Sequence, residues 1–149
     1  MKGQQDIVKN PPHGGTSSDP FTISNDLNAV QTVTVWIADG SYYTDRQLVK
    51  AIKVVYSDGT DRGSGNQTGT SHTFKFDSGE KVTSMGIWTG ANVDRIRWVT
   101  NHGRTFDHGG TGGTERPQQV GNGILLGFSG STNENELVSL GSSFKEDSD

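Results

Sequence analysis

The sequence predicts an all-β protein made of three similar units, and three observations favour this fold class. Apolar and polar residues alternate over short runs, as they do in strands with one buried face; residues 82–88 and 93–99 are clear examples. The 149 residues include 21 glycines, about twice the usual share of roughly 7%. These glycines lie between the alternating runs, where tight turns use their conformational freedom. The runs also recur at a fixed spacing.

Residues 81–113 define the repeated unit, which contains a strand, a polar loop, a second strand and a glycine-rich run. The second strands of the three units align without gaps at residues 49–52, 93–96 and 137–140, so their starts are 44 residues apart in both steps. A fixed period with one supersecondary unit per repeat is typical of repeat architectures. Because each unit has about four short strands and no helical pattern, the sequence favours a closed or three-faced β architecture.

Turn and loop signals separate the expected strands. An Asp-Gly pair makes a hairpin turn in the first unit, and the glycine-rich residues 63–69 are expected to form a loop. The polar loop 39–47 is the longest of three equivalent loops. Tyr42 and Tyr43 at its tip either stack on a ligand ring or face another subunit, or one covers the core while the other is exposed. The expected strands are residues 21–23, 30–37, 48–56, 72–76, 82–88, 93–99, 104–106, 124–128 and 137–140.

Length and composition predict one domain without a membrane span. We expect the domain over residues 11–144, with residues 1–10 frayed or forming an edge strand and a polar tail at 145–149. No apolar run approaches the roughly 20 residues of a transmembrane helix. No secretory signal is visible, which predicts a cytoplasmic protein, unconventional secretion, or a signal already removed. The absence of cysteine excludes disulfides and thiolate metal sites.

The composition and motifs argue against nucleic-acid binding, catalysis and metal binding. The formal net charge of −4 is unlike the basic surface of a nucleic-acid binder. No HExxH, GxSxG or phosphate-binding glycine motif is present, so we expect no enzyme, no metal and no cofactor. His13 and His108 each precede a Gly-Gly pair, and we expect them to be equivalent in the repeat rather than to converge on one ion.

The glycine-rich loops favour a different ligand chemistry. Glycine lets backbone N–H groups approach a ligand closely. A nearby carboxylate accepts charge-assisted hydrogen bonds from two hydroxyls at once. Together these two parts suit a shallow site for a neutral, polyhydroxylated ring. The alternative is that the glycines serve only turns and that the carboxylates are solvated.

Three motifs, in this order and spacing, resemble the jacalin-related lectin family over about residues 12–144. They are HGGTSSDPF near the N-terminus, GEKVTSMGIWTGANVDRIRWVTNHGRTFDHGGTGGT in the middle, and NGILLGFSGS with LVSLG near the end. The resemblance implies a β-prism I fold of three four-stranded, antiparallel, Greek-key-like sheets around a pseudo-threefold axis, often assembled as a homo-oligomer (dimer or tetramer). It also implies binding of mono- or oligosaccharides and glycoproteins. In that family a monosaccharide, often mannose or galactose, lies between a Gly-rich loop and a Gly-x-x-x-Asp loop.

This sequence departs from the family pattern in where the aspartate lies. Only the central repeat keeps the Gly-x-x-x-Asp loop, at residues 90–94, and its partner by the threefold relation is the glycine loop 109–113. The resemblance implies that Asp94 accepts two sugar hydroxyls while the backbone N–H groups of Ala91 and Asn92 donate to others. The predicted binding residues here are Gly90, Ala91, Asn92, Asp94, Gly109 and Gly110.

The usual sugar site of the family, beside the N-terminal glycine loop, lacks its aspartate here. Val138 occupies that position, and Lys50 occupies the equivalent position in the first repeat. Glu134 or Glu136, from a longer loop, could supply the carboxylate instead. The predicted residues of this second candidate site are Gly14, Gly15, Asn133, Glu134 and Asn135.

Two functions from different classes therefore stay open at this point. The first is a lectin that recognises mannose- or galactose-type glycans. The second is a β-prism that has lost sugar binding and serves as a protein-interaction or assembly module. A weaker third alternative is a sugar-active or membrane-acting toxin component. The orientation of Asp94 separates the first two, since a lectin needs Asp94 to face the loop 109–113 rather than open solvent.

Overall fold

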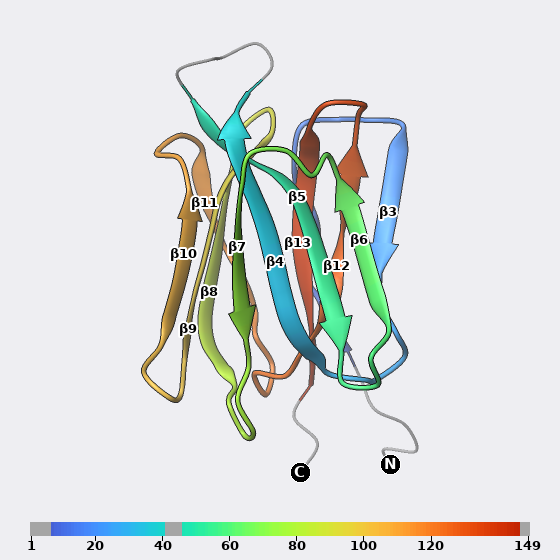
Figure 1. Ribbon diagram of the computed structural model, residues 1–149, viewed down its shortest axis with the longest axis vertical. Helices are drawn as coiled ribbons and strands as arrows, with labels where there is room; N and C mark the ends of the chain where they lie inside the picture. The colour runs from blue at the N-terminus through green and yellow to red at the C-terminus, as the bar shows by residue number, and fades with distance from the viewer. Residues whose placement is uncertain (1–6, 41–45, 147–149) are drawn as a thin grey trace.

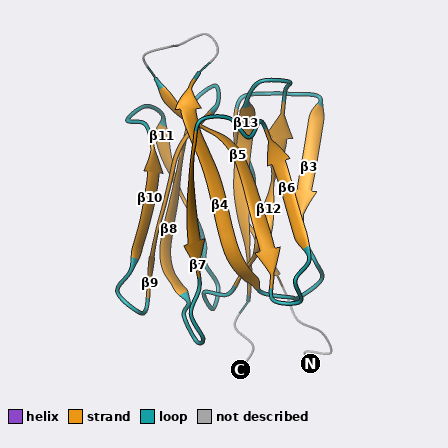
Figure 2. Ribbon diagram, in the orientation of Figure 1, coloured by secondary structure: helices purple, strands orange, loops and turns teal. Residues whose placement is uncertain are grey.

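The computed structural model describes residues 7–40 and 46–146, and every named element in them is a β-strand. The strands form three sheets that pack around one core, as Figures 1 and 2 show. The all-β prediction is confirmed. Tyr42 and Tyr43 lie outside the described residues, so their predicted role stays a prediction. The described residues contain no helix long and apolar enough to cross a membrane.

The first sheet is antiparallel, with the strand order β6-β5-β4-β7. Its strands are β4 (Val30–Asp39), β5 (Gln47–Tyr56), β6 (Asp61–Gly65) and β7 (Thr70–Lys75). The expectation of a loop over residues 63–69 is wrong for residues 63–65, which pair with β5. The sequence did not predict this strand because it is rich in glycine and has no apolar alternation, which an exposed edge strand does not need.

The second sheet repeats this arrangement with the order β10-β9-β8-β11. Its strands are β8 (Val82–Thr89), β9 (Val93–Thr100), β10 (Thr105–Gly109) and β11 (Thr114–Pro117). Strand β11 is absent from the sequence prediction, because Thr-Glu-Arg-Pro carries no apolar alternation. It is nevertheless paired to β8 along its whole length.

The third sheet is built from both ends of the chain. Its strands are β1 (Ile7–Lys9), β2 (His13–Gly14), β3 (Asp19–Ile23), β12 (Leu125–Thr132) and β13 (Leu137–Lys145). The order is β1-β13-β12-β3, and the two-residue β2 also pairs with β13. The N-terminal segment is not in strand conformation at residues 10–12, although Asn10 N–H still donates to the carbonyl of Ser142 (2.9 Å), so this segment contributes two short strands where the other sheets have one. Lys145, expected in a polar tail, is the last residue of β13.

The three sheets share irregularities as well as strands. Each central strand pair has two register shifts, and the shift nearer the upper end in Figure 1 falls at 36/37, 88/89 and 131/132. Such bulges increase local twist and bend the strand. Their recurrence at the same end of each central strand pair shows that the three sheets share one plan, although these shifts do not follow the 44-residue spacing of the second strands.

The core lies between the sheets and is filled by the inward-facing residues of the central strands. Val33, Ile52, Ile87, Ile96 and Leu140 are fully buried, as the alternating pattern predicts. The largest buried side chain is Trp98, which contacts the rings of Phe74 and Phe106. A shared core fixes the three sheets relative to one another, so the loops at each end of the prism are held on a rigid frame.

Candidate functional site

The three glycine-rich loops meet at one end of the prism, which we call the glycine-loop end; it is the upper end in Figure 1. At this end each second strand binds its glycine loop by the same backbone hydrogen bond. Gly110 N–H donates to the carbonyl of Asp94 (2.7 Å), Gly15 to Val138 (3.1 Å), and Asn66 to the carbonyl of Lys50 (2.9 Å). The three positions aligned by the 44-residue period therefore have the same place in the fold and differ in their side chains.

Asp94 lies beneath the loop 109–113, with only 2% of its surface exposed. A Cβ atom added to Gly112 would lie 2.7 Å from Asp94 Oδ2, and one added to Gly113 would lie 2.8 Å from Asp94 Oδ1. Gly113 also has a φ of +81°, which favours glycine. Glycines at 112 and 113 are therefore required for the loop to approach the carboxylate this closely.

The Asp94 carboxylate is buried and incompletely hydrogen-bonded. Oδ2 has no hydrogen-bond partner among the described residues. Burial raises the pKa of Asp94, while the nearby Arg46 and a hydrogen bond from the Gly90 backbone oppose that rise. A buried acceptor without a donor is unfavourable, so Oδ2 is ready to accept a hydrogen bond from a ligand.

The neighbouring repeat also reaches this site. A Cβ added to Gly110 would lie 2.3 Å from the carbonyl oxygen of Gln47, at the start of β5. The side chain of Arg46 lies close to Gly112, with its Nε 3.6 Å from the position of an added Cβ. The sequence interpretation missed Arg46 and Gln47, because the 44-residue period shows which positions are equivalent but not which repeats touch.

The predicted loop 90–94 is placed as a tight turn above Asp94. Gly90 N–H donates to the carbonyl of Asn92 (3.0 Å). Gly90 and Ala91 are exposed, and Asn92 is half-buried. Gly109 lies in β10, and a Cβ added to it would lie 2.2 Å from the Asp94 carbonyl oxygen. The structure thus brings all six residues predicted for the central site to the same end of the second sheet, and their roles in sugar binding stay predictions.

The second candidate site is arranged differently, because an apolar side chain lies where Asp94 lies in the second sheet. Val138 is buried, and its Cγ1 would lie 3.2 Å from a Cβ added to Gly15. That same Cβ would lie 2.3 Å from the carbonyl oxygen of Ala91 in the neighbouring repeat. The predicted residues of the loop beside Val138 are exposed; these are Asn133, Glu134 and Asn135.

Glu136, one of two candidates for the missing carboxylate, takes part in a buried ion pair. Its Oε1 lies 2.9 Å from Lys50 Nζ, and the two side chains are 4% and 5% exposed. Lys50 Nζ also donates to the carbonyl of Asp39 (3.3 Å). Lys50, the first-repeat equivalent of Asp94, therefore joins the first and third repeats instead of forming an acceptor site.

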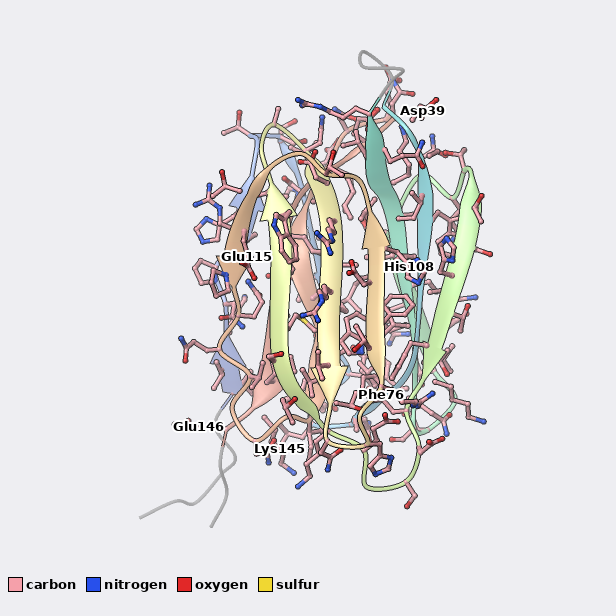
Figure 3. The ribbon with its side chains drawn as sticks, turned by 90° about the vertical axis from the view of Figure 1, so that its left-hand side faces the viewer. Asp39, Phe76, His108, Glu115, Lys145 and Glu146 are labelled. Carbon is pink, nitrogen blue, oxygen red and sulfur yellow. The ribbon has the colours of Figure 1, made fainter. Side chains whose placement is uncertain are left out.

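His13 and His108 occupy equivalent register positions, opposite Leu140 in β13 and Ile96 in β9. His108 stacks on His72 of the first sheet, with ring centroids 3.8 Å apart. Figure 3 shows His108 at the boundary between these two sheets. Burial, followed by the neighbouring His72, lowers the pKa of His108. The near-parallel rings form a packing contact, which the sequence interpretation did not predict.

One group of possible metal ligands occurs in the described residues, at the end opposite the glycine loops. Ligand atoms of Asp77, Glu80 and His102 lie within 4.8 Å of one another. However, Thr100 and Arg104 both donate hydrogen bonds to Glu80. The Arg104 guanidinium lowers the pKa of that carboxyl to about 2. The arrangement is that of a stabilising ion-pair network rather than an open ligand set.

A cavity of about 360 Å³ lies at that same opposite end. Apolar residues that line it include Val30, Phe76 and Leu125. Asp39 near the glycine loops and Phe76 beside this cavity mark the two ends in Figure 3. The cavity is therefore remote from Asp94, and the buried carboxylate in its lining, Glu80, already accepts hydrogen bonds from Thr100 and Arg104.

Comparison with known proteins identifies the family. The profile of the jacalin-like lectin domain matches residues 11–143, so the chain belongs to the jacalin-like lectin domain family. This is a family of non-enzymatic, carbohydrate-binding domains, and membership supports carbohydrate binding by this chain. No curated protein matches the chain.

Several solved structures share the fold. Lamprey immune protein superposes with a TM-score of 0.77 at 26% identity over 96% of this chain, which spans 44% of that protein's chain. Wild-type Malaysian banana lectin gives a TM-score of 0.73 at 20% identity, covering 95% of this chain and 100% of the lectin. AcmJRL, a mannose-binding jacalin-related lectin from Ananas comosus, gives a TM-score of 0.73 at 22% identity, and the match covers 92% of this chain and 96% of that lectin. The predicted β-prism is thereby confirmed.

Proposed function

We propose that this protein is a lectin that binds a mannose- or galactose-type glycan at the second repeat. The site consists of the loop 90–94, the loop 109–113 and the carboxylate of Asp94. Sugar hydroxyls donate hydrogen bonds to Asp94, and backbone N–H groups of the two loops donate to sugar oxygens. The family supplies the ligand class, and a mannose-binding relative with the same fold supports the choice of sugar.

One observation carries the location of the site. Asp94 Oδ2 is buried beneath glycines 112 and 113 and has no hydrogen-bond donor among the described residues. A carboxylate in this state is costly for a purely structural role. It becomes favourable when a ligand hydroxyl supplies the donor, because hydrogen bonds to charged groups are worth about 1.5–3 kcal/mol.

The proposal is tested by glycan-array screening and titration calorimetry of the wild type, Asp94→Asn and Glu134→Ala. Asp94→Asn keeps the shape of the side chain but replaces the charged acceptor. We expect the wild type to bind neutral mannosides or galactosides, Asp94→Asn to lose about tenfold or more in affinity, and Glu134→Ala to bind normally. Thermal unfolding monitored by circular dichroism checks that each variant is folded.

Two outcomes would overturn this assignment. If Glu134→Ala loses binding and Asp94→Asn keeps it, the working site lies beside Gly14 and Gly15. If the folded wild type binds no glycan, the protein-interaction module becomes the better function. We also propose a homo-oligomer, since linked weak sites gain affinity through effective concentration; sedimentation velocity of the same samples measures it.

A further inference from the structure

We propose that the second-repeat site selects glycans that carry an anionic group, a carboxylate or a sulfate, and that Arg46 binds this group. The inference rests on the proposed function, because it takes Asp94 as the acceptor for the sugar hydroxyls. It adds a specificity-determining residue from the neighbouring repeat. The ligand would then need hydroxyls at one position and a negative charge at another.

The position of its side chain places Arg46 at the site. Its Nε lies 3.6 Å from the position of a Cβ added to Gly112, the residue that covers Asp94 Oδ2. Its charge also acts on Asp94, where it opposes the rise in pKa that burial causes. Arg46 is exposed, whereas Asp94 beneath it is buried. A ligand that enters over Gly112 therefore meets the guanidinium before it reaches the carboxylate.

The chemistry of the two side chains is complementary. Ionised Asp94 can only accept hydrogen bonds, so it suits hydroxyl groups and repels an anion. The guanidinium of Arg46 has five N–H donors in a planar arrangement that matches carboxylate and other oxyanions, so it can serve a ligand besides its contacts within the protein. A neutral sugar satisfies Asp94 alone, and an acidic glycan satisfies both.

The repeat shows that this cation is specific to one site. The residues at the same distance before Asp94 and Val138 are Gly90 and Glu134, so the other two repeats carry a neutral and an acidic residue at this position. Gly15, in the other candidate site, packs on Ala91 rather than on a cationic loop. An anionic preference is therefore expected from the second-repeat site and not from the one beside Val138.

Nearby acids restrict where the anionic group can lie. The Asp39 carboxylate accepts a hydrogen bond from the side chain of Gln47, so it is close to the same loop. Asp94 is also close, because its Oδ2 and Arg46 Nε lie 2.7 Å and 3.6 Å from the same position, that of a Cβ added to Gly112. The anionic group must consequently extend from the glycan at a distance from the hydroxyls that Asp94 binds, on the solvent side of the loop. A substituent on a neighbouring sugar or on a different carbon of the ring meets this condition.

The test compares matched glycans on the wild type and three variants. The array carries neutral mannose- and galactose-terminated glycans beside the same glycans with a sulfate, a uronic acid or a sialic acid. The variants are Arg46→Gln, Arg46→Lys and the control Arg62→Gln, which removes one exposed positive charge from β6. Calorimetry then measures the affinity for the best neutral and anionic pair.

We expect the wild type to bind the anionic glycan about tenfold more tightly than its neutral parent. Arg46→Gln should abolish this difference, so that the variant binds the anionic glycan and its neutral parent with equal affinity. Arg46→Lys should keep part of it, because lysine keeps the charge but not the planar fork. Arg62→Gln should behave as the wild type. The sulfate and carboxylate arms show which anion the site takes.

The salt dependence gives a second readout. Raising the ionic strength from about 0.1 M to about 1 M shortens the Debye length from about 10 Å to about 3 Å, so it should weaken anionic binding more than neutral binding. Equal affinities of the wild type for both members of a pair would overturn the inference about Arg46 alone. Normal binding of neutral glycans by Asp94→Asn would instead overturn the proposed function, so the two failures are distinguishable.

Discussion

The second and third sheets present the same backbone at the glycine-loop end but different side chains beneath it. Each glycine loop donates the same hydrogen bond to its neighbouring strand, to Asp94 in one sheet and to Val138 in the other. Asp94 brings a buried carboxylate with an unpartnered oxygen, whereas Val138 brings a methyl group to the same place. The comparison teaches that the repeat fixes the backbone at this end, and that the side chain beneath each glycine loop determines whether a buried acceptor is present there.

The first sheet has a third kind of side chain at the equivalent position. Lys50 is buried like the other two residues, but it is paired with Glu136 of the third repeat. A structural ion pair thus replaces a ligand site. The three equivalent positions thus hold a buried acceptor, an apolar side chain and a cation that is paired with another repeat.

The largest effect on stability among the three equivalent positions is expected from a substitution of Lys50. Lys50→Met leaves the Glu136 carboxylate buried without its cation, and this should lower the free energy of unfolding by about 3–5 kcal/mol. Urea unfolding followed by tryptophan fluorescence measures the change. The double variant Lys50→Met/Glu136→Gln removes both charges and should recover most of the loss. Equal stability of the wild type and Lys50→Met would show that the pair has no structural role.

Val138→Asp tests whether a carboxylate at the position equivalent to Asp94 creates a second sugar-binding site in the third sheet. The new carboxylate is buried beside Gly15, so we expect a loss of about 1–3 kcal/mol in the free energy of unfolding. The same change should raise the number of sugars bound per chain from one to two in calorimetry. Val138→Asn, of similar size but uncharged, is the control and should stay at one. A folded Val138→Asp protein with unchanged stoichiometry would show that more than this side chain is missing.

The smallest effect is expected when the Asp94 charge is removed. Asp94→Asn removes the charge of a buried carboxylate that has one unpartnered oxygen, and we expect stability at neutral pH to stay constant or to rise by up to about 1 kcal/mol. Burial raises the pKa of Asp94 in the folded state, so the native protein binds this proton more tightly than the unfolded chain. Its contribution to stability therefore increases as the pH falls toward the ordinary pKa of 3.8, and sugar affinity decreases over the same range.

The measurement for Asp94 is the difference in unfolding free energy between the wild type and Asp94→Asn at several pH values. Taking this difference removes the opposite contribution of Glu80, whose pKa is lowered. The free energy of unfolding of the wild type should increase relative to that of Asp94→Asn as the pH falls. A difference that does not change with pH would mean that Asp94 titrates as an ordinary exposed carboxyl.

The sequence allowed the repeat and most strands to be predicted because each central strand alternates around one core. Val93 and Ile96 are buried as their pattern indicates. Strands β6 and β11 were not predicted because edge strands are held by backbone pairing, which leaves little trace in composition. The same reason explains β2, which has only two residues.

For the candidate site, the sequence indicated the two loops but not their neighbours. The spacing of Gly90 and Asp94 was visible in one repeat, whereas the approach of Arg46 depends on how the first and second sheets pack. The stacking of His72 on His108 arises in the same way, from two edge strands of different sheets. Glu136 was a candidate acceptor by position, and only the fold reveals Lys50 beside it.

The pairing of both chain ends in one sheet sets the order in which the molecule can be completed. Ile7 lies opposite Lys145, so β1 gains its partner only after the first and second sheets and β12 have been made. The strands of the first sheet are consecutive in sequence, and so are those of the second. Both sheets can therefore assemble before β13, the last strand of the third sheet, has been made. The start of β1 and the end of β13 lie together on the side of the prism away from the glycine loops (Figure 1). A surface that held the protein at this side would therefore leave the glycine loops facing outward.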